Sequence, residues 1–167
     1  MSAPDRAGSA AVIVASTSAA HGLAADRTGP VIRTWLQDRG FAVAEPVVVA
    51  DGEEVGLALR RALAAGCAVV LTTGGTGVSP DDRTPEQTEP LLDVQVPGLM
   101  EALRRVGEAE SPRSLITRGL AGFAGRVFVM NLPGSPGGVA DGLQVLDPLL
   151  EHLLAQRSGQ KDHPRER

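Results

Sequence analysis

Residues 68–86 read AVVLTTGGTGVSPDDRTPE, and this stretch decides the fold. Its first four residues are a short apolar run, typical of a strand that is buried on both faces. A loop at 72–84 follows, rich in glycine, threonine and aspartate. The tripeptide Thr84-Pro85-Glu86 then has the pattern of a helix start, with Thr84 as the N-cap and Pro85 at the first helical position. A buried strand that leads through a loop into a helix predicts a parallel α/β sheet.

Strand and helix patterns alternate on both sides of this stretch. Further strands are predicted at 11–14, 43–49 and 126–130, and the last is expected to pair with the segment around Leu120. Helices are predicted at 28–39, with Val31, Ile32, Trp35 and Leu36 on one face, at 51–65, near 99–106, and at 139–153 with a break at Pro148. The prediction is a three-layer α/β fold, a mainly parallel sheet with helices on both faces. Residues 1–9 and 157–167 are predicted to be flexible tails, which leaves 10–156 as one domain.

Composition excludes several classes of protein. With 167 residues, 43% apolar and 22% charged, the chain is predicted to be a globular domain rather than a disordered segment. A net charge of −4, one Trp and no Tyr argue against nucleic-acid binding. A single cysteine excludes an intramolecular disulfide framework. No apolar run approaches the roughly 18 residues of a membrane span, and the start of the chain lacks a signal-peptide core, so we expect a cytoplasmic protein.

Four loops follow the predicted parallel strands, at 16–18, 50–52, 72–84 and 131–138, and all are rich in hydroxyl, carboxylate or glycine. Because ligands of open α/β sheets bind where the strands end, these loops are expected to form one binding site.

The loop at 72–84 has the features of a phosphate-binding loop. Its glycines can leave backbone N–H groups free for an anion, and its threonines add hydroxyl donors. Asp81 and Asp82 would repel a phosphate unless a metal lay between, which is how Mg²⁺ is commonly held. The alternative is an ordinary surface turn. The candidate binding residues of this loop are Thr73, Gly74, Gly75, Thr76 and Gly77.

The sequence NLPGSPGGV at 131–139 predicts a second anion site. Ser135 is placed to cap a helix whose first residue is Pro136, which directs free N–H groups and the positive end of the helix dipole toward the sheet edge. The motif lacks the lysine of a Walker A loop, and a plain strand–turn–helix joint is the alternative. The candidate binding residues are Asn131, Pro133, Gly134, Ser135 and Pro136.

Two further carboxylates each allow two interpretations. Asp51-Gly52-Glu53-Glu54 is a D-x-x-E capping box, which alone explains Asp51, yet Asp51 also ends a predicted strand at the ligand edge. Local sequence favours the cap. Asp26, just before the first predicted helix, is either a carboxylate facing the ligand edge or a charge at a helix end. Both alternatives stay open for Asp26.

The pattern TTGGTG-(x)4-D-x-TP, joined to NLPGSPGGV, resembles the MogA/MoaB family of molybdenum cofactor biosynthesis, and within it the molybdopterin adenylyltransferases. The resemblance extends from the strand at Ala11 to the helix at Leu154, and it includes Gly22, Asp26, Gly29 and Pro30. The chain departs from many relatives at Ser16-Thr17-Ser18, where they carry Ser-Asp-Arg or Ser-Asp-Ser.

This resemblance implies the molybdenum cofactor biosynthesis fold, a homotrimer, and transfer of AMP from Mg-ATP to the terminal phosphate of molybdopterin with release of pyrophosphate. It implies that Asp82 and Asp51 are the catalytic and metal-holding carboxylates, and that Ser16 and Asp26 contact substrate. The alternative is a non-catalytic, MoaB-like oligomer that delivers molybdopterin to a separate molybdenum insertase. Because a mere binder would have no need for two metal-holding carboxylates, their presence favours the enzyme.

Overall fold

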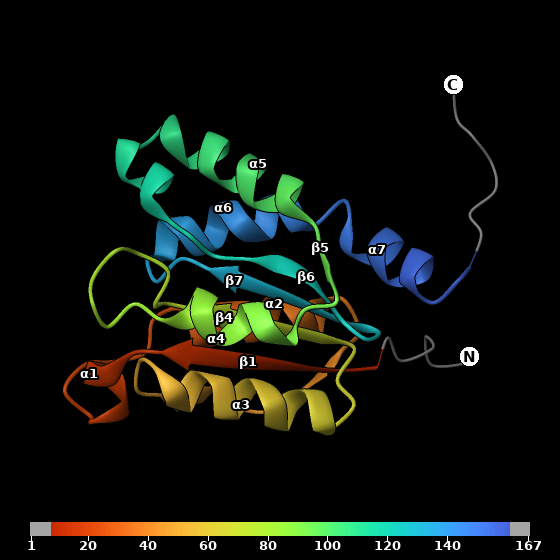
Figure 1. The fold of residues 1–167 in the computed structure, drawn as a ribbon, viewed down its shortest axis with the longest axis horizontal. Coiled ribbons are helices and arrows are strands. Elements are labelled where there is room, and N and C mark those ends of the chain that lie inside the picture. The colour runs from red at the N-terminus through yellow and green to blue at the C-terminus, as the bar shows by residue number, and fades with distance from the viewer. Residues whose placement is uncertain (1–7, 161–167) are drawn as a thin grey trace.

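The computed structural model describes residues 8–160 and confirms the predicted α/β fold, a sheet with helices on both faces (Figure 1). One sheet of seven strands runs in the order β2-β1-β4-β7-β6-β5. The seventh strand, β3, also pairs with β1, at its carboxyl-terminal half, whereas β2 pairs with the start of β1. Strands β2, β3 and β4 are parallel to β1, and β7 is parallel to β4. Strand β6 is antiparallel to both of its neighbours, β5 and β7, and forms a hairpin with β7. The strands are β1 (Ser9–Ala15), β2 (Ala42–Val43), β3 (Val47–Val49), β4 (Val69–Thr73), β5 (Val94–Gln95), β6 (Ala121–Ala124) and β7 (Val127–Leu132).

Helices cover both faces of the sheet. Helix α3 packs on one face, and helices α2, α5 and α6 pack on the other. The break at Pro148 separates α6 from α7, as predicted. No helix within residues 8–160 is long and apolar enough to cross a lipid bilayer. The helices are α1 (Thr17–Ala20), α2 (Gly29–Asp38), α3 (Glu53–Ala64), α4 (Thr84–Thr88), α5 (Pro97–Glu108), α6 (Pro136–Leu146) and α7 (Leu150–Arg157), with short 3-10 turns at Glu89–Leu91 and Pro112–Ile116.

Strand β4 is the centre of the core. Val69 and Leu71 face the cluster under α2, α5 and α6, whereas Val70 faces the cluster under α3. All three side chains are fully buried. This accounts for the continuous apolar run, because a central parallel strand has no solvent-facing side.

Two predictions about the fold were wrong in detail. The single strand expected at 43–49 is two short strands, because Pro46 lies between them and has no N–H for the ladder. Val31 does not share the buried face of α2 but is 52% exposed. Strand β1 begins at Ser9 and helix α7 ends at Arg157, so each extends one residue past the bounds of 10–156 that are expected for the domain. The outer parts of the predicted tails, 1–7 and 161–167, lie outside the described residues.

Candidate functional site

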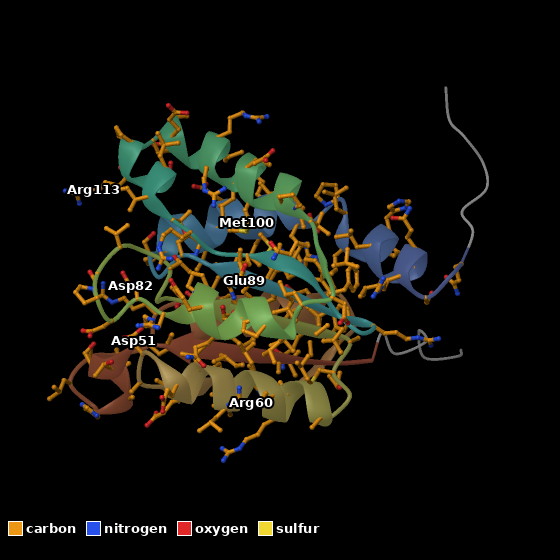
Figure 2. All side chains as sticks on the ribbon, in the orientation of Figure 1. Asp51, Arg60, Asp82, Glu89, Met100 and Arg113 are labelled. Atoms are coloured by element: carbon orange, nitrogen blue, oxygen red, sulfur yellow. The ribbon has the colours of Figure 1, made fainter. Side chains whose placement is uncertain are left out.

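The four predicted loops meet in one cavity of about 480 Å³ at the carboxyl ends of β1, β3, β4 and β7. Figure 2 shows Asp51 and Asp82 at this end of the sheet, beside α1. The arrangement follows from strand direction, because the carboxyl ends of mutually parallel strands share an edge. The predicted residues that line this cavity are Ser16, Asp26, Asp51, Thr73, Gly74, Gly75, Asp82, Gly134 and Pro136.

Glycine lets three of these loops pack backbone against backbone. Gly74 has φ +89°, and a Cβ added to it would overlap the carbonyl oxygen of Ala15. A Cβ on Gly134 would lie 3.3 Å from the Gly74 Cα. Any larger residue at position 74 would therefore separate the ends of β1 and β4 as well as force a strained backbone. Gly75 completes the turn with φ +67°, and its N–H has no acceptor within residues 8–160.

Asp51 does not cap α3, so the capping-box prediction was wrong. The N-cap of α3 is Gly52, with φ 99° and no side-chain cap, and Glu54 instead accepts a hydrogen bond from the Ala50 N–H at 3.1 Å. The Asp51 Oδ2 atom accepts hydrogen bonds from the Thr17 N–H at 3.2 Å and the Thr17 hydroxyl at 3.0 Å. Asp51 thus connects the end of β3 to α1, and both Asp51 and Thr17 line the cavity.

The other oxygen of Asp51 faces the glycine loop. A Cβ added to Gly75 would lie 3.1 Å from Asp51 Oδ1. Within the described part of the chain, Oδ1 accepts no hydrogen bond. One carboxylate oxygen is therefore used to hold α1, and the other is available to a ligand in the cavity.

Asp82 approaches the same loop from the opposite end. A Cβ on Gly77 would lie 2.7 Å from Asp82 Oδ2. That oxygen accepts a hydrogen bond from the Ser79 N–H at 3.0 Å, while the Asp82 N–H donates to the Ser79 carbonyl at 2.9 Å. The two bonds close a turn over 79–82 and direct the carboxylate back toward the glycines. Asp51 and Asp82 therefore flank the glycine turn from its two ends.

Asp26 satisfies both of the interpretations left open for it. Its Oδ1 atom accepts hydrogen bonds from the N–H groups of Thr28 at 3.1 Å and Gly29 at 2.9 Å, at the start of α2. It also lines the cavity. Because Asp26 accepts hydrogen bonds from two N–H groups that have no partner within the helix, one of its carboxylate oxygens stabilises the start of α2.

Five predicted binding residues do not line this cavity: Thr76, Gly77, Asn131, Pro133 and Ser135. Ser135 caps α6 as predicted, accepting from the Gly138 N–H at 3.1 Å, and with Pro133 it borders a second cavity of about 410 Å³. Thr76 is buried and shares a 2.9 Å hydrogen bond with the Thr117 hydroxyl. Direct substrate contacts by these five residues stay predictions.

Thr84 was predicted to be an N-cap, but it is the first residue of α4, and Arg83 precedes the helix in the N-cap position. The Thr84 hydroxyl donates to the Gly74 carbonyl at 3.0 Å, and the Thr84 N–H donates to the Gly75 carbonyl at 3.1 Å. Thr84 therefore closes the base of the glycine loop instead of capping the helix.

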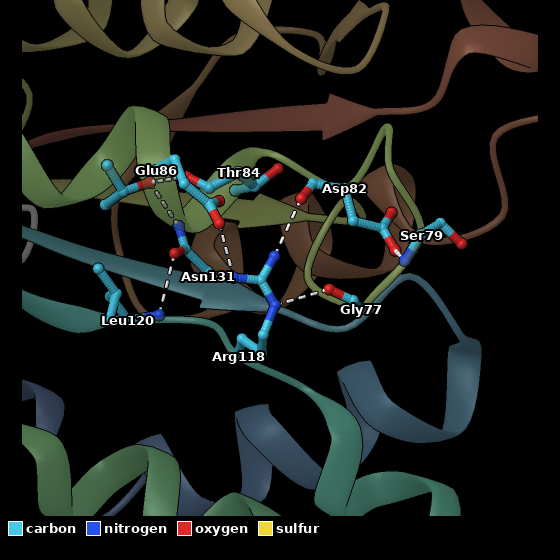
Figure 3. Close-up of polar contacts among 9 residues, drawn as sticks. Gly77, Ser79, Asp82, Thr84, Glu86, Arg118, Leu120 and Asn131 are labelled. Carbon is cyan, nitrogen blue, oxygen red and sulfur yellow. Dashed lines mark hydrogen bonds and ion pairs between the residues drawn. The ribbon is translucent and has the colours of Figure 1, made fainter.

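Asn131 is fully buried, and its amide has structural partners. Its Nδ2 donates to the hydroxyls of Thr72 at 3.0 Å and Thr88 at 3.1 Å, and its Oδ1 accepts from the Leu120 N–H at 3.0 Å. Figure 3 shows this amide between β7 and α4. Asn131 thus connects β7, which leads into the loop at 131–138, to α4, which follows the loop at 72–84.

Asn131→Ala is expected to destabilise the fold by about 1–3 kcal/mol, because it leaves the Leu120 N–H and two hydroxyls without their partner in the interior. Urea unfolding of the variant measures the loss. Thr34→Ala, at an exposed position of α2, is the control and should change stability little. An unchanged midpoint for Asn131→Ala would show that water replaces the amide.

Sequence reasoning missed three residues of the site. Arg27 lines the cavity, Thr17 holds Asp51, and Arg118 contacts the loop that carries Asp82. No local motif marks them, since Thr17 lies 34 residues from Asp51 and Arg118 lies 36 residues from Asp82. Arg118 also pairs with Glu86 at 2.6 Å, and this hydrogen bond holds the pKa of Glu86 below its ordinary value, against a smaller opposing effect of burial.

The cavity has an excess of negative charge. Its lining includes the carboxylates Asp26, Asp51, Asp81 and Asp82 but one guanidinium, that of Arg27. The described residues contain no cluster of three or more side chains able to hold a metal by themselves. Asp51 and Asp82 are the carboxylates that could hold a divalent cation here, because Mg²⁺ is commonly bound through one or two carboxylates together with phosphate oxygens of a substrate.

Comparison with known families gives a match over nearly all of residues 8–160. Residues 11–152 match the family described as "Probable molybdopterin binding domain". The chain is 42% identical over 155 residues to the molybdenum cofactor biosynthesis bifunctional protein of Synechococcus elongatus, covering 92% of this chain and 48% of that protein. It is 36% identical over 148 residues to the molybdopterin adenylyltransferase of Pyrococcus furiosus, covering 86% and 87%. The chain thus spans about half the length of the bifunctional relatives.

Solved structures show the same fold. The molybdopterin biosynthesis Mog protein from Mycobacterium ulcerans is 51% identical with a TM-score of 0.87, over 90% of this chain and 99% of that one. The molybdopterin biosynthesis enzyme MoaB from Thermus thermophilus is 39% identical with a TM-score of 0.80, over 91% and 96%. The similarity therefore extends to proteins with both kinds of name.

Proposed function

The chain belongs to the family of probable molybdopterin-binding domains, and on that premise we propose that it is a molybdopterin adenylyltransferase of molybdenum cofactor biosynthesis. In this reaction a terminal phosphate oxygen of molybdopterin attacks the α-phosphorus of ATP. A new P–O–P linkage forms, the bond from the α-phosphorus to the β-phosphate oxygen breaks, and pyrophosphate leaves. The observation that carries the proposal is the pair Asp51 and Asp82, which flanks a glycine turn inside one cavity.

The chemistry explains why no strong base is required. The second pKa of a phosphate monoester is about 6, so the attacking group is already largely dianionic at pH 7. The difficulty is to bring two anions together in line, which calls for positioning and charge neutralisation. Mg²⁺ held by Asp51 and Asp82 would supply that neutralisation.

The residues of the chain do the positioning. The free oxygen of Asp51 and the carboxylate of Asp82 lie at the two ends of the glycine turn and would hold the cation between them. The Gly75 N–H is free to donate to a phosphate oxygen. Arg27 also lines the cavity, and its guanidinium can bind a further phosphate. Gly74 and Gly134 keep the loops close enough for one ligand to contact both.

A second candidate function is a non-catalytic, MoaB-like role, favoured by the 39% identity to the Thermus thermophilus MoaB. Such a protein would bind molybdopterin in the same cavity and deliver it to a separate insertase. The two candidates differ in one property, since only the enzyme releases pyrophosphate. Assembly into a homotrimer is proposed for both, and sedimentation of the full chain tests it.

The test is incubation of the full chain with Mg-ATP and molybdopterin. We expect stoichiometric pyrophosphate and adenylylated molybdopterin, a rate at least tenfold lower in excess EDTA, and recovery on adding Mg²⁺ or Mn²⁺. The cavity carries too little cationic charge to neutralise a triphosphate without a metal. Molybdopterin binding without pyrophosphate would instead favour the second candidate, and an unchanged rate in EDTA would contradict the metal role.

A further inference from the structure

The loop that carries Asp82 has little to hold it in place by burial. Residues 78–81 are exposed, and Val78 is 71% exposed despite its apolar side chain. The turn over 79–82 is closed by its own two Ser79–Asp82 hydrogen bonds. Those bonds fix the shape of the turn but do not attach it to the sheet. Thr84 holds the base of the loop, so hydrogen bonds that reach 77–82 from elsewhere decide how firmly the Asp82 carboxylate is held beside Gly77.

Arg118 supplies that attachment, from the segment between α5 and β6. Its Nε donates to the Gly77 carbonyl at 2.8 Å, and its Nη2 donates to the Asp82 carbonyl at 3.0 Å. Within residues 8–160, these are the hydrogen bonds that reach 77–82 from outside the loop. Figure 3 shows the guanidinium between Gly77, Asp82 and Glu86. One side chain thus spans both ends of the loop.

Arg118 is itself held in the orientation that this contact needs. Its Nη1 donates to Glu86 Oε1 at 2.6 Å, from the first turn of α4, and its backbone N–H donates to the Thr76 carbonyl at 2.7 Å. The adjacent Thr117 is buried and hydrogen-bonds Thr76. Because a planar guanidinium directs several donors in fixed directions, it can meet three acceptors at once, whereas a lysine ammonium is a point charge on a flexible stem.

We propose that Arg118 is a positioning residue of the adenylyl-transfer site, which fixes the 77–82 loop so that Asp82 faces the glycine turn. The proposal rests on the proposed function for its catalytic consequence, but not for the contact itself. Arg118 does not line the cavity, so it acts through Asp82 and not on the substrate. Without its guanidinium the loop loses its external hydrogen bonds, and Asp82 samples positions from which it cannot share a cation with Asp51.

The test compares Arg118→Ala and Arg118→Lys with two controls in the full chain. Arg33→Ala removes a guanidinium that likewise bonds a backbone carbonyl, of Val43, and a glutamate, Glu45, outside the cavity. Glu86→Gln removes the ion pair but leaves both carbonyl contacts of Arg118. Amide hydrogen exchange by mass spectrometry reports the loop directly, and the Mg²⁺ dependence of the rate reports Asp82.

We expect Arg118→Ala to accelerate exchange of the Ser79 and Asp82 amides, which the turn protects, at least tenfold while β1 and β4 are unchanged. The Mg²⁺ concentration for half-maximal rate should rise about fivefold, with much of the rate recovered at high Mg²⁺, and Arg118→Lys should restore only part of the effect. Arg33→Ala should show neither change, and Glu86→Gln should change both by less than twofold.

Unchanged exchange of the Ser79 and Asp82 amides in Arg118→Ala would overturn the proposal, as would a rate loss that high Mg²⁺ does not relieve. The same loss in Arg33→Ala would also overturn it, because a general structural effect would then explain the result. If the unaltered chain shows no adenylyl transfer, the proposed function fails, and hydrogen exchange alone still decides whether Arg118 holds the loop.

Discussion

Asp82→Ala is expected to abolish adenylyl transfer, with no detectable pyrophosphate release, while molybdopterin still binds. The carboxylate lies beside Gly77 in a cavity lined also by Asp26, Asp51 and Asp81, and under the proposed function it would help to hold the divalent cation. Asp82 is partly exposed on a surface loop, so its removal should leave the melting temperature nearly unchanged. Turnover is measured by pyrophosphate release, and pterin binding by fluorescence titration.

The Ser79–Asp82 turn makes a second variant necessary. Asp82→Asn keeps an oxygen that can accept from the Ser79 N–H, at 3.0 Å in the structure, but removes the negative charge. If charge is what matters, both variants are inactive. If Asn restores turnover, Asp82 serves only to shape the loop, and full turnover by Asp82→Ala would remove it from the mechanism. Asp38→Ala, at an exposed position of α2 outside the cavity, is the control.

The parts of the fold that the sequence predicts well are those set by local pattern. Val69, Val70 and Leu71 form an unbroken apolar run, and the structure buries all three on a central strand. Ser135-Pro136 has the pattern of a helix start and caps α6. The convergence of four loops in one cavity follows from the same reasoning, because parallel strands bring their carboxyl ends together.

The parts that could not be predicted depend on contacts between distant segments. The D-x-x-E pattern at Asp51 is a valid local signal, but Gly52 takes the cap position and Thr17, 34 residues away, takes the carboxylate. Asn131 is an apparent loop residue in sequence, yet it lies fully buried at the end of β7. Arg118 has no motif, since its acceptors are mostly backbone carbonyls, which any residue provides.

Asp51 is the residue whose interpretation changes most, and this changes what its substitution should do. The structure gives α3 a glycine N-cap, so Asp51→Asn should not weaken that helix. The amide can still offer an oxygen to the Thr17 N–H and hydroxyl, which Asp51 Oδ2 accepts at 3.2 and 3.0 Å. The expected melting temperature is therefore close to that of the unaltered chain.

Turnover of Asp51→Asn is nevertheless expected to fall about a hundredfold, or roughly 2.7 kcal/mol in the activation barrier. The free oxygen Oδ1 lies beside Gly75, and an amide there brings no charge to a cation. Thr17→Val provides the contrast, because it removes the hydroxyl that steadies the carboxylate and keeps the charge, so its loss should be much smaller. Normal turnover in a folded Asp51→Asn protein would leave Asp51 as a connection between β3 and α1. Equal losses in the two variants would show that placement of the carboxylate, more than its charge, limits the reaction.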